Sequence, residues 1–224
     1  MGAKDSYALQ VDIVSDVVCP WCVIGYKQLE KALSVVAGEF HAEIRWHPFE
    51  LNPQITQAGE DLREHIARKY GGGPERGNAT RDHLTRLGHS LGFEFDYFEG
   101  MRVVNTFRAH QLLHWAALHG KQTDLKLALF EAFFSRRQDV NDTAVLAALC
   151  EQVGLPVTEA VSVLDDERFA VEVREQEQFW RDKDVYAVPT FMLQGQYMVP
   201  GAQEAEAFVR VFRKIRDRAL ARGL

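Results

Sequence analysis

The sequence of 224 residues lacks an excess of positive charge, long apolar runs and many cysteines, and each absence excludes a class of protein. Its 26 Lys and Arg stand against 32 Asp and Glu, a net charge of −6, so nothing attracts it globally to nucleic acid or anionic lipid. No window approaches the roughly 18 uninterrupted apolar residues of a membrane span. The start, MGAKDSYALQVDIV, has neither the basic segment nor the apolar run of a secretory leader. These features favour a cytoplasmic protein whose partners are neither nucleic acid nor membrane.

Cysteine is scarce, but two of the three cysteines are neighbours in the motif CPWC, at Cys19 and Cys22. Cytoplasmic thiols are kept reduced, so a close pair is more typical of catalysis, redox sensing or metal binding than of a permanent disulfide. A structural zinc site needs four ligands, and Cys150 lies far away in an apolar helical context typical of an inert buried thiol. The sequence therefore favours a redox pair and predicts neither a metal nor a cofactor.

Apolar periodicity predicts where the pair lies. Residues 8–14 predict a buried strand, and the segment after the cysteines predicts a helix that ends near Gly38. Pro20 suits the first turn of that helix, because its fixed φ is helical and its missing N–H leaves no bond unmade. Residues 41–51 predict a second strand. A strand–helix–strand unit of this length implies a parallel pair joined by a right-handed crossover.

Beyond residue 57 the pattern becomes helical for about a hundred residues. It then predicts an amphipathic helix at 165–183, two short strands around a two-residue turn at Gln194–Gly195, and a closing helix. The chain therefore reads as an α/β protein with one discontinuous domain, residues 1–57 and 165–224, and an inserted all-helical domain. The insertion spans residues 58–164, with helices expected at 60–70, 79–92, 103–120, 124–137 and 142–154.

The spacing of the CPWC cysteines defines their chemistry. Two cysteines at i and i+3 in a first helical turn have Cα atoms within the range of about 4.4 to 6.8 Å that a disulfide needs. Cys19 is at the helix start, where free N–H groups and the helix dipole stabilise a thiolate, so we expect it to be the more exposed and more acidic nucleophile. Cys22, one turn on, is the expected resolving cysteine, which attacks the mixed disulfide on Cys19. Trp21 covers the loop.

Two weaker signals are open to ordinary explanations. His110 and His114 have the i, i+4 spacing that can bind a metal, but no acidic partner follows, so packing histidines are favoured. Pro189 in VYAVPTF stands at the entry to a strand, where a trans proline is tolerated. On spacing alone, the trans form is the expectation.

Five blocks together show a family resemblance. SDVVCPWCVIG, WHPFELNP, NTFRAHQL, VPTF and VPGAQ, in this order, resemble the FrnE-like branch of the DsbA family of dithiol-disulfide oxidoreductases. The resemblance covers nearly the whole chain. It implies a thioredoxin fold interrupted by an all-helical domain, and it implies protein thiols, protein disulfides or glutathione as substrates.

The resemblance also implies roles for particular residues. Pro189 would be cis and lie opposite Cys19, with Val188 offering backbone groups to an extended substrate and with Pro20 and Trp21 beside it. Asn105 and His110, from the NTFRAHQL block, would lie on the helical lid near the dithiol. The chain departs from the family at Pro200, where many relatives have serine, and it has no cysteine after Cys150, so an internal thiol relay is not expected.

Two other functions are consistent with parts of the sequence. The related 2-hydroxychromene-2-carboxylate isomerases and kappa-class glutathione transferases have a serine in place of the first cysteine and activate glutathione. Cys19 argues against that alternative, because a low-pKa thiolate beside a second cysteine would oxidise or form a mixed disulfide. A redox-independent peptide-binding module is the third hypothesis, and activity that survives Cys19→Ser would favour it.

Overall fold

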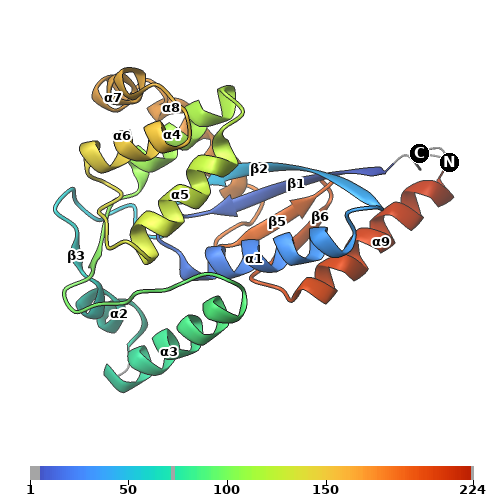
Figure 1. Ribbon diagram of the computed structural model, residues 1–224, viewed down its shortest axis with the longest axis horizontal. Helices are drawn as coiled ribbons and strands as arrows, with labels where there is room; N and C mark the ends of the chain where they lie inside the picture. The colour runs from blue at the N-terminus through green and yellow to red at the C-terminus, as the bar shows by residue number, and fades with distance from the viewer. Residues whose placement is uncertain (1–5, 72–73, 223–224) are drawn as a thin grey trace.

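The computed structural model describes residues 6–71 and 74–222. Its centre is a four-stranded sheet with the strand order β2-β1-β5-β6 (Figure 1). β1 pairs in parallel with β2 from Tyr7↔Phe40 to Ser15↔Pro48, as predicted, while β5 runs antiparallel to β1 and β6 runs antiparallel to β5. The strands are β1 (Tyr7–Ser15), β2 (Phe40–Pro48), β5 (Thr190–Leu193) and β6 (Tyr197–Pro200).

Helices cover both faces of this sheet. α1 (Pro20–Val35) and α9 (Ala205–Ala221) pack against each other on the face that includes Val11 and Ile13. On the other face, Trp180 of α8 (Ala170–Arg181) packs with Val14 of β1. β1 is therefore buried on both sides, and its last residues lead directly into the cysteines at the start of α1.

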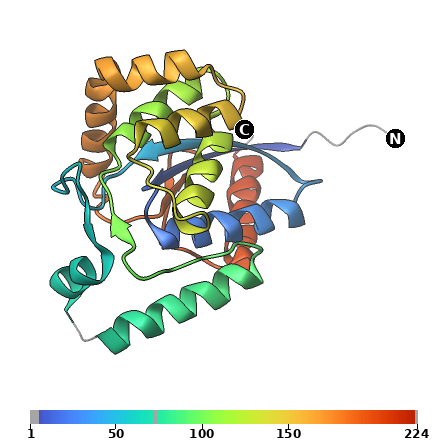
Figure 2. The same ribbon diagram turned by 60° about the vertical axis from the view of Figure 1, so that its left-hand side comes forward.

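The insertion between β2 and β5 is mostly helical and forms the body seen at the upper left of Figure 1, with α2 and α3 extending below it (Figures 1 and 2). A two-stranded ladder pairs β3 with β4, the strands before α2 and after α3, and was not expected from the sequence. In the described residues, no helix is long and apolar enough to cross a membrane. The elements are β3 (Glu60–Asp61), α2 (Leu62–Tyr70), α3 (Pro74–Ser90), β4 (Arg102–Val103), α4 (Phe107–Leu118), α5 (Gln122–Phe134), α6 (Thr143–Gln152) and α7 (Val157–Asp166).

Two local predictions are wrong. The helix expected at 165–183 is the end of α7 followed by α8, because Glu167 adopts the left-handed conformation with φ 48° and ends α7. The turn around Gln194–Gly195 contains three residues rather than two, since Leu193 pairs with Tyr197. Both errors arise where residues adopt positive φ, Glu167 in the first case and Gln194 and Gly195 in the second, and periodicity does not reveal such residues.

The insertion is fastened to the free edge of β2 by Gln122, the first residue of α5. The Gln122 side-chain amide accepts a hydrogen bond from Trp46 N at 2.9 Å and donates one to Trp46 O at 2.9 Å. These two hydrogen bonds satisfy the backbone N–H and C=O of Trp46 at the sheet edge, as a neighbouring strand would. Trp46 Nε1 also donates to Thr123 Oγ1 at 3.0 Å. Because residues four apart share a helix face, this docking directs Lys126 of α5 toward the end of β1.

Candidate active site at the Cys19–Cys22 pair

The CPWC motif forms the first turn of α1, as the sequence predicts. Cys19 is the residue before the helix, Pro20 is its first residue, and Cys22 N donates to Cys19 O at 3.0 Å. Both cysteines are free thiols and both are buried, with exposed fractions of 3% for Cys19 and 1% for Cys22. Cys19 lines a cavity between the sheet and the insertion, whereas Cys22 is not part of the wall of that cavity. An incoming sulfur atom therefore meets Cys19 first.

A distant segment completes the site. The Val188–Pro189 peptide bond is cis, and the Cys19 thiol donates to the Val188 carbonyl oxygen at 3.7 Å. The position that the resemblance implied for Pro189 is confirmed. Gly25 of α1 allows this approach, because a Cβ at that position would lie 2.9 Å from Pro189 Cγ and 3.1 Å from the Phe191 ring. Pro189 O accepts a hydrogen bond from Gly201 N at 2.8 Å, which brings the VPGAQ block to the site.

Lys126 is a fully buried cation beside the dithiol. Its Nζ donates to Ser15 O at 3.4 Å and lies 5.3 Å from the centre of the Trp46 ring and 5.0 Å from that of Phe130. Burial lowers the pKa of Lys126 to about 8, while negative charge on Cys22 and Asp16 opposes that decrease. A buried ammonium is costly unless it is paired, so Lys126 favours a thiolate at the pair.

The two thiols titrate as one unit. Burial raises the pKa of Cys22, but the hydrogen bond from Cys19 and the charge of Lys126 outweigh burial and leave this pKa below its ordinary value. The pKa of Cys19 lies well above its ordinary value, because of the same hydrogen bond and because of burial. Cys19 has a single S–H, which it can direct either to the Val188 carbonyl or to Cys22, and both partners require that Cys19 is protonated.

The directions of these two pKa changes are opposite to the expectation that Cys19 is the more acidic thiol, whereas its position on the cavity wall agrees with the expected order of access. The helix start acts on Cys19 as predicted, but Lys126 comes from the insertion and favours charge on Cys22. The sequence did not indicate which residues Lys126 contacts. The interaction between the two sulfur atoms couples their titration, so the first negative charge that forms belongs to the pair.

Asp16 and His110 form a second buried pair next to Lys126. Asp16 Oδ2 accepts from Leu51 N at 2.8 Å, and Asp16 Oδ1 lies 3.4 Å from His110 Nε2. Burial raises the pKa of Asp16. The interactions with His110, Leu51 N and Lys126 lower it by more than burial raises it, so the pKa lies below its ordinary value. His110 does not line the cavity. Its ring faces Asp16 instead.

Three other residues singled out in the sequence lie apart from the cysteines. Asn105 Nδ2 donates to Ile55 O at 3.0 Å and its Oδ1 accepts from Phe107 N at 3.0 Å, which fixes the start of α4 and leaves Asn105 outside the cavity wall. His114 Nδ1 pairs with Gln176 Nε2 at 2.9 Å, so it is a packing histidine as favoured. Cys150 is fully buried, and burial raises its pKa to about 12, as expected of an inert thiol.

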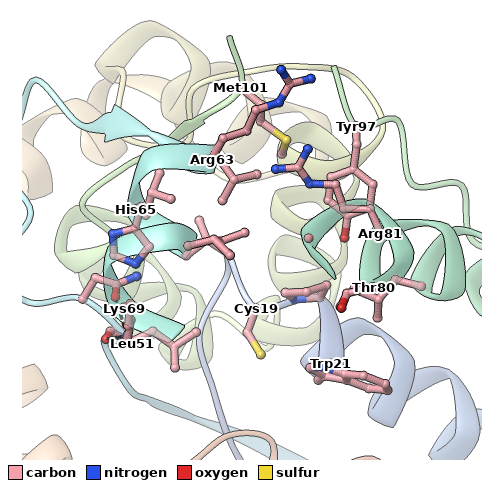
Figure 3. A pocket seen from close by; sticks show the side chains of 18 of the residues that line it. Cys19, Trp21, Leu51, Arg63, His65, Lys69, Thr80, Arg81, Tyr97 and Met101 are labelled. Carbon is pink, nitrogen blue, oxygen red and sulfur yellow. Dashed lines mark hydrogen bonds between the residues drawn. The ribbon is translucent and has the colours of Figure 1, made fainter. Parts of the chain in front are cut away.

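The cavity above Cys19 has a volume of about 1000 Å³ and lies between the CPWC loop, α2 and α3. Figure 3 shows its polar residues on two walls, with His65 and Lys69 on one side, Tyr97 and Arg81 on the other, and Cys19 between them. Trp21 is 39% exposed at its edge, with its ring centre 6.2 Å from that of His83. Much of the wall is apolar, from residues that include Leu51, Leu62, Ile66, Leu84, Met101, Val103, Phe133 and Phe134.

Local sequence patterns did not predict the residues of the insertion that lie at the site. A signal for Lys126 exists: it is the single cation in the run LKLALFEAFF, where the surrounding side chains are apolar. A lysine in such a run is either exposed or paired in the core. Arg81 and Tyr97 carry no comparable signal, because each lies in a segment of mixed polarity.

Two cysteines in the first turn of a helix that follows the central strand, with a cis proline beside them, are the site of a thiol-disulfide oxidoreductase of the thioredoxin fold. Residues 10–213 match the DSBA-like thioredoxin domain, so the chain belongs to that family. It is similar to a structure of a probable DsbA oxidoreductase from Streptomyces coelicolor, with 31% identity, a TM-score of 0.87, and coverage of 92% of this chain and 89% of that one.

More distant structures share the fold. The cytosolic disulfide reductase DsbM from Pseudomonas aeruginosa, also solved with GSH, has a TM-score of 0.62 at 18% identity and covers 93% of this chain and 98% of its own. A 2-hydroxychromene-2-carboxylate isomerase has a TM-score of 0.66 at 18% identity, with the same two coverages. At these identities the likeness concerns the architecture alone.

Proposed function

We propose that the protein exchanges disulfides with thiol substrates through Cys19 and Cys22 and a mixed-disulfide intermediate. The observation that carries this proposal is the position of the pair: two reduced sulfurs in one helical turn, one facing a cavity and the other beside a buried ammonium. Val188 and Pro189 close the site on the other side of Cys19. Protein thiols and glutathione are the substrate classes, and the DsbM structure with GSH supports the second of them.

The exchange proceeds in two substitutions at sulfur. A proton passes from Cys19 to Cys22 across their hydrogen bond, and the Cys19 thiolate attacks one sulfur of the substrate disulfide. The S–S bond of the substrate breaks, one substrate thiolate leaves, and Cys19 is held in a mixed disulfide. Cys22 then loses its proton again, with Lys126 stabilising the charge, and attacks Cys19. The second substrate thiolate leaves, the protein holds a Cys19–Cys22 disulfide, and the two substrate thiolates take up the one cysteine proton and one proton from solvent.

Backbone and aromatic groups around Cys19 orient the substrate in this proposal. The Val188 carbonyl, which accepts the Cys19 thiol in the reduced protein, becomes free when Cys19 loses its proton and can pair with an extended substrate. Pro20 and Trp21 form the adjoining wall of the cavity. His110 acts through Asp16, and Asn105 keeps the start of α4 in place.

Trapping of the intermediate tests the proposal. Cys22→Ser retains the attacking cysteine but lacks the resolving one, so we expect it to accumulate a mixed disulfide with glutathione or with protein thiols, visible as a mass increase at Cys19. Cys19→Ser is the matched control and should trap nothing. Equal trapping by the two variants would show that the roles of attack and resolution are wrong.

The same variants separate exchange from the glutathione-dependent isomerase or transferase alternative. A reaction that only orients glutathione sulfur does not need a resolving cysteine, so it would survive Cys22→Ser with multiple turnovers. Disulfide exchange stops after one turnover in that variant. A redox titration of the Cys19–Cys22 pair against glutathione, read by mass spectrometry, then gives the direction of net electron flow.

A further inference from the structure

Three residues of the cavity wall each have a buried side-chain atom without a hydrogen-bond partner among the described residues: Arg81 and Tyr97 present a donor, and Glu50 presents an acceptor, Oε1. The Nε of Arg81 and the hydroxyl of Tyr97 are buried, and neither has a hydrogen-bond partner among the described residues. Both residues line the cavity together with Cys19. A buried polar group is nearly always paired, and leaving one unpaired costs about 1 to 3 kcal/mol. The pair therefore indicates a point where a ligand supplies the missing acceptor.

Arg81 and Tyr97 act as one unit close to the reactive sulfur. The guanidinium carbon of Arg81 lies 5.9 Å from the centre of the Tyr97 ring, and Figure 3 shows the two side chains next to each other on one wall. Burial raises the pKa of Tyr97, the charge of Arg81 lowers it, and negative charge on Cys19 raises it again. The hydroxyl therefore stays protonated and donates, within electrostatic reach of Cys19.

Other cations on the wall are already engaged. Lys69 Nζ donates to Leu51 O at 2.9 Å and to Asn52 Oδ1 at 2.6 Å. Arg63 is half exposed and lies 3.6 Å from Glu99. Arg81 is different because its Nε–H is buried on the cavity wall with no acceptor. A guanidinium N–H and a phenol O–H on adjacent side chains match an oxygen acceptor with negative charge, for which a carboxylate is the planar partner.

The size of the cavity and the burial of Cys19 limit the rest of the ligand. A volume of about 1000 Å³ is that of a small-molecule site, and its apolar side chains suit a short carbon chain. Cys19 is only 3% exposed, so a disulfide held within a folded protein does not reach it without displacing α2 or α3.

We propose that the cavity selects small disulfides and thiols that carry a carboxylate, which Arg81 and Tyr97 bind while the substrate sulfur meets Cys19. This inference rests on the exchange reaction proposed above and names its substrate class. The chemistry is unchanged: the small disulfide RS–SR is reduced to two RSH, and the Cys19–Cys22 dithiol is oxidised to a disulfide.

Two small disulfides that differ in charge test this inference. The reduced protein is mixed with dithiodipropionate, which carries two carboxylates, or with hydroxyethyl disulfide, which is neutral, and the second-order rate of oxidation is followed by mass spectrometry of quenched samples. Arg81→Gln should lower the rate with dithiodipropionate by roughly tenfold or more, the factor expected for a hydrogen bond to a charged group. Tyr97→Phe should lower it by a smaller factor. Neither variant should change the rate with hydroxyethyl disulfide.

Arg86→Gln is the matched control, because Arg86 is an exposed arginine of the same helix that does not line the cavity. It removes the same charge and should change neither rate. An equal loss with both disulfides in Arg81→Gln would overturn the inference, as would an unchanged rate with dithiodipropionate. If neither disulfide oxidises the wild-type protein, the exchange function itself is wrong, so the two failures are distinguishable.

Discussion

Cys22 and Cys150 are equally buried thiols in two regions of the molecule, and their acidity changes in opposite directions. Cys150 lies in α6 among apolar side chains, where burial alone raises its pKa to about 12. Cys22 is 1% exposed, yet its pKa is lowered because the Cys19 thiol and the Lys126 ammonium outweigh burial. The comparison teaches that burial does not make a thiol inert. The charge and the hydrogen-bond donor that are buried with the thiol decide the outcome.

This contrast also shows what the helical insertion contributes to the surroundings of the dithiol. The thioredoxin part supplies both sulfurs and the Val188–Pro189 segment, but the buried cation comes from α5 of the insertion. Gln122 holds α5 on the edge of β2, one helical turn before Lys126. The insertion is therefore part of the electrostatics of the dithiol as well as the wall above it.

Removing the charge of Lys126 should make the acidity of Cys22 more like that of Cys150. We expect this change to have the largest effect on disulfide exchange. Lys126→Met keeps the length of the side chain and removes its charge, so the pKa of the first thiol to ionise should rise. The rate of disulfide exchange at pH 7 should fall roughly tenfold or more, the factor for losing a charged partner. Thiolate absorbance near 240 nm as a function of pH measures the first effect.

Lys121→Met is the control for that experiment, since Lys121 is exposed and paired with Asp124 at the start of the same helix. It should leave the titration unchanged. An unaltered thiol titration in Lys126→Met would show that Lys126 does not set the acidity of the pair.

The next largest effect, on stability and on exchange rate, is expected where α1 approaches Pro189. Gly25→Val places side-chain atoms where even a Cβ would lie 2.9 Å from Pro189 Cγ, so α1 and the Val188–Pro189 segment must separate. Overpacking of this kind costs about 1 to 3 kcal/mol of stability. We also expect disulfide exchange to slow, because Cys19 moves with α1. Gly38→Val, with nothing within 4 Å of its Cβ position, is the control for both denaturant unfolding and exchange rate.

The stability of the protein should depend on pH through Lys126. Its pKa is about 8 in the folded protein against an ordinary value of 10.5, so between these two pH values the unfolded chain binds more protons. The free energy of unfolding then rises with pH across that window, and the penalty for burying the ammonium is complete below pH 8. The stability advantage of Lys126→Met over the wild type should accordingly shrink from pH 8 to 10.5. Denaturant unfolding at several pH values measures it, and a constant difference would contradict the assignment.

The smallest effect on stability and exchange is expected around Cys150 in α6. Cys150→Ala removes a buried sulfur that has no charged partner, so stability should fall by about 1 kcal/mol from the small cavity left behind. Exchange kinetics and the thiol titration should not change. Loss of exchange in this variant would mean that Cys150 takes part in the thiol chemistry, and the contrast with Cys22 would fail.

Much of this molecule follows from local patterns in the sequence. Alternation and periodicity predicted the parallel β1–α1–β2 unit, because buried strands and amphipathic helices repeat with different periods. The i, i+3 spacing and Pro20 placed both cysteines in one helical turn. The position of Pro189 came from the family resemblance, since a strand-start proline is otherwise expected to be trans. The two boundaries that were predicted wrongly, at Glu167 and in the loop after Leu193, depend on residues that leave regular structure.

The sequence by itself determined that this protein carries a redox pair at the start of a helix in an α/β fold, because spacing and helix geometry are local properties. Only the tertiary structure decided which sulfur holds the charge and what surrounds the other. Lys126 is more than a hundred residues from Cys22 in the chain, and Arg81 and Tyr97 reach the cavity from a separate layer. Acidity depends on distances between charges and on burial, and the packing of the insertion against the sheet sets both.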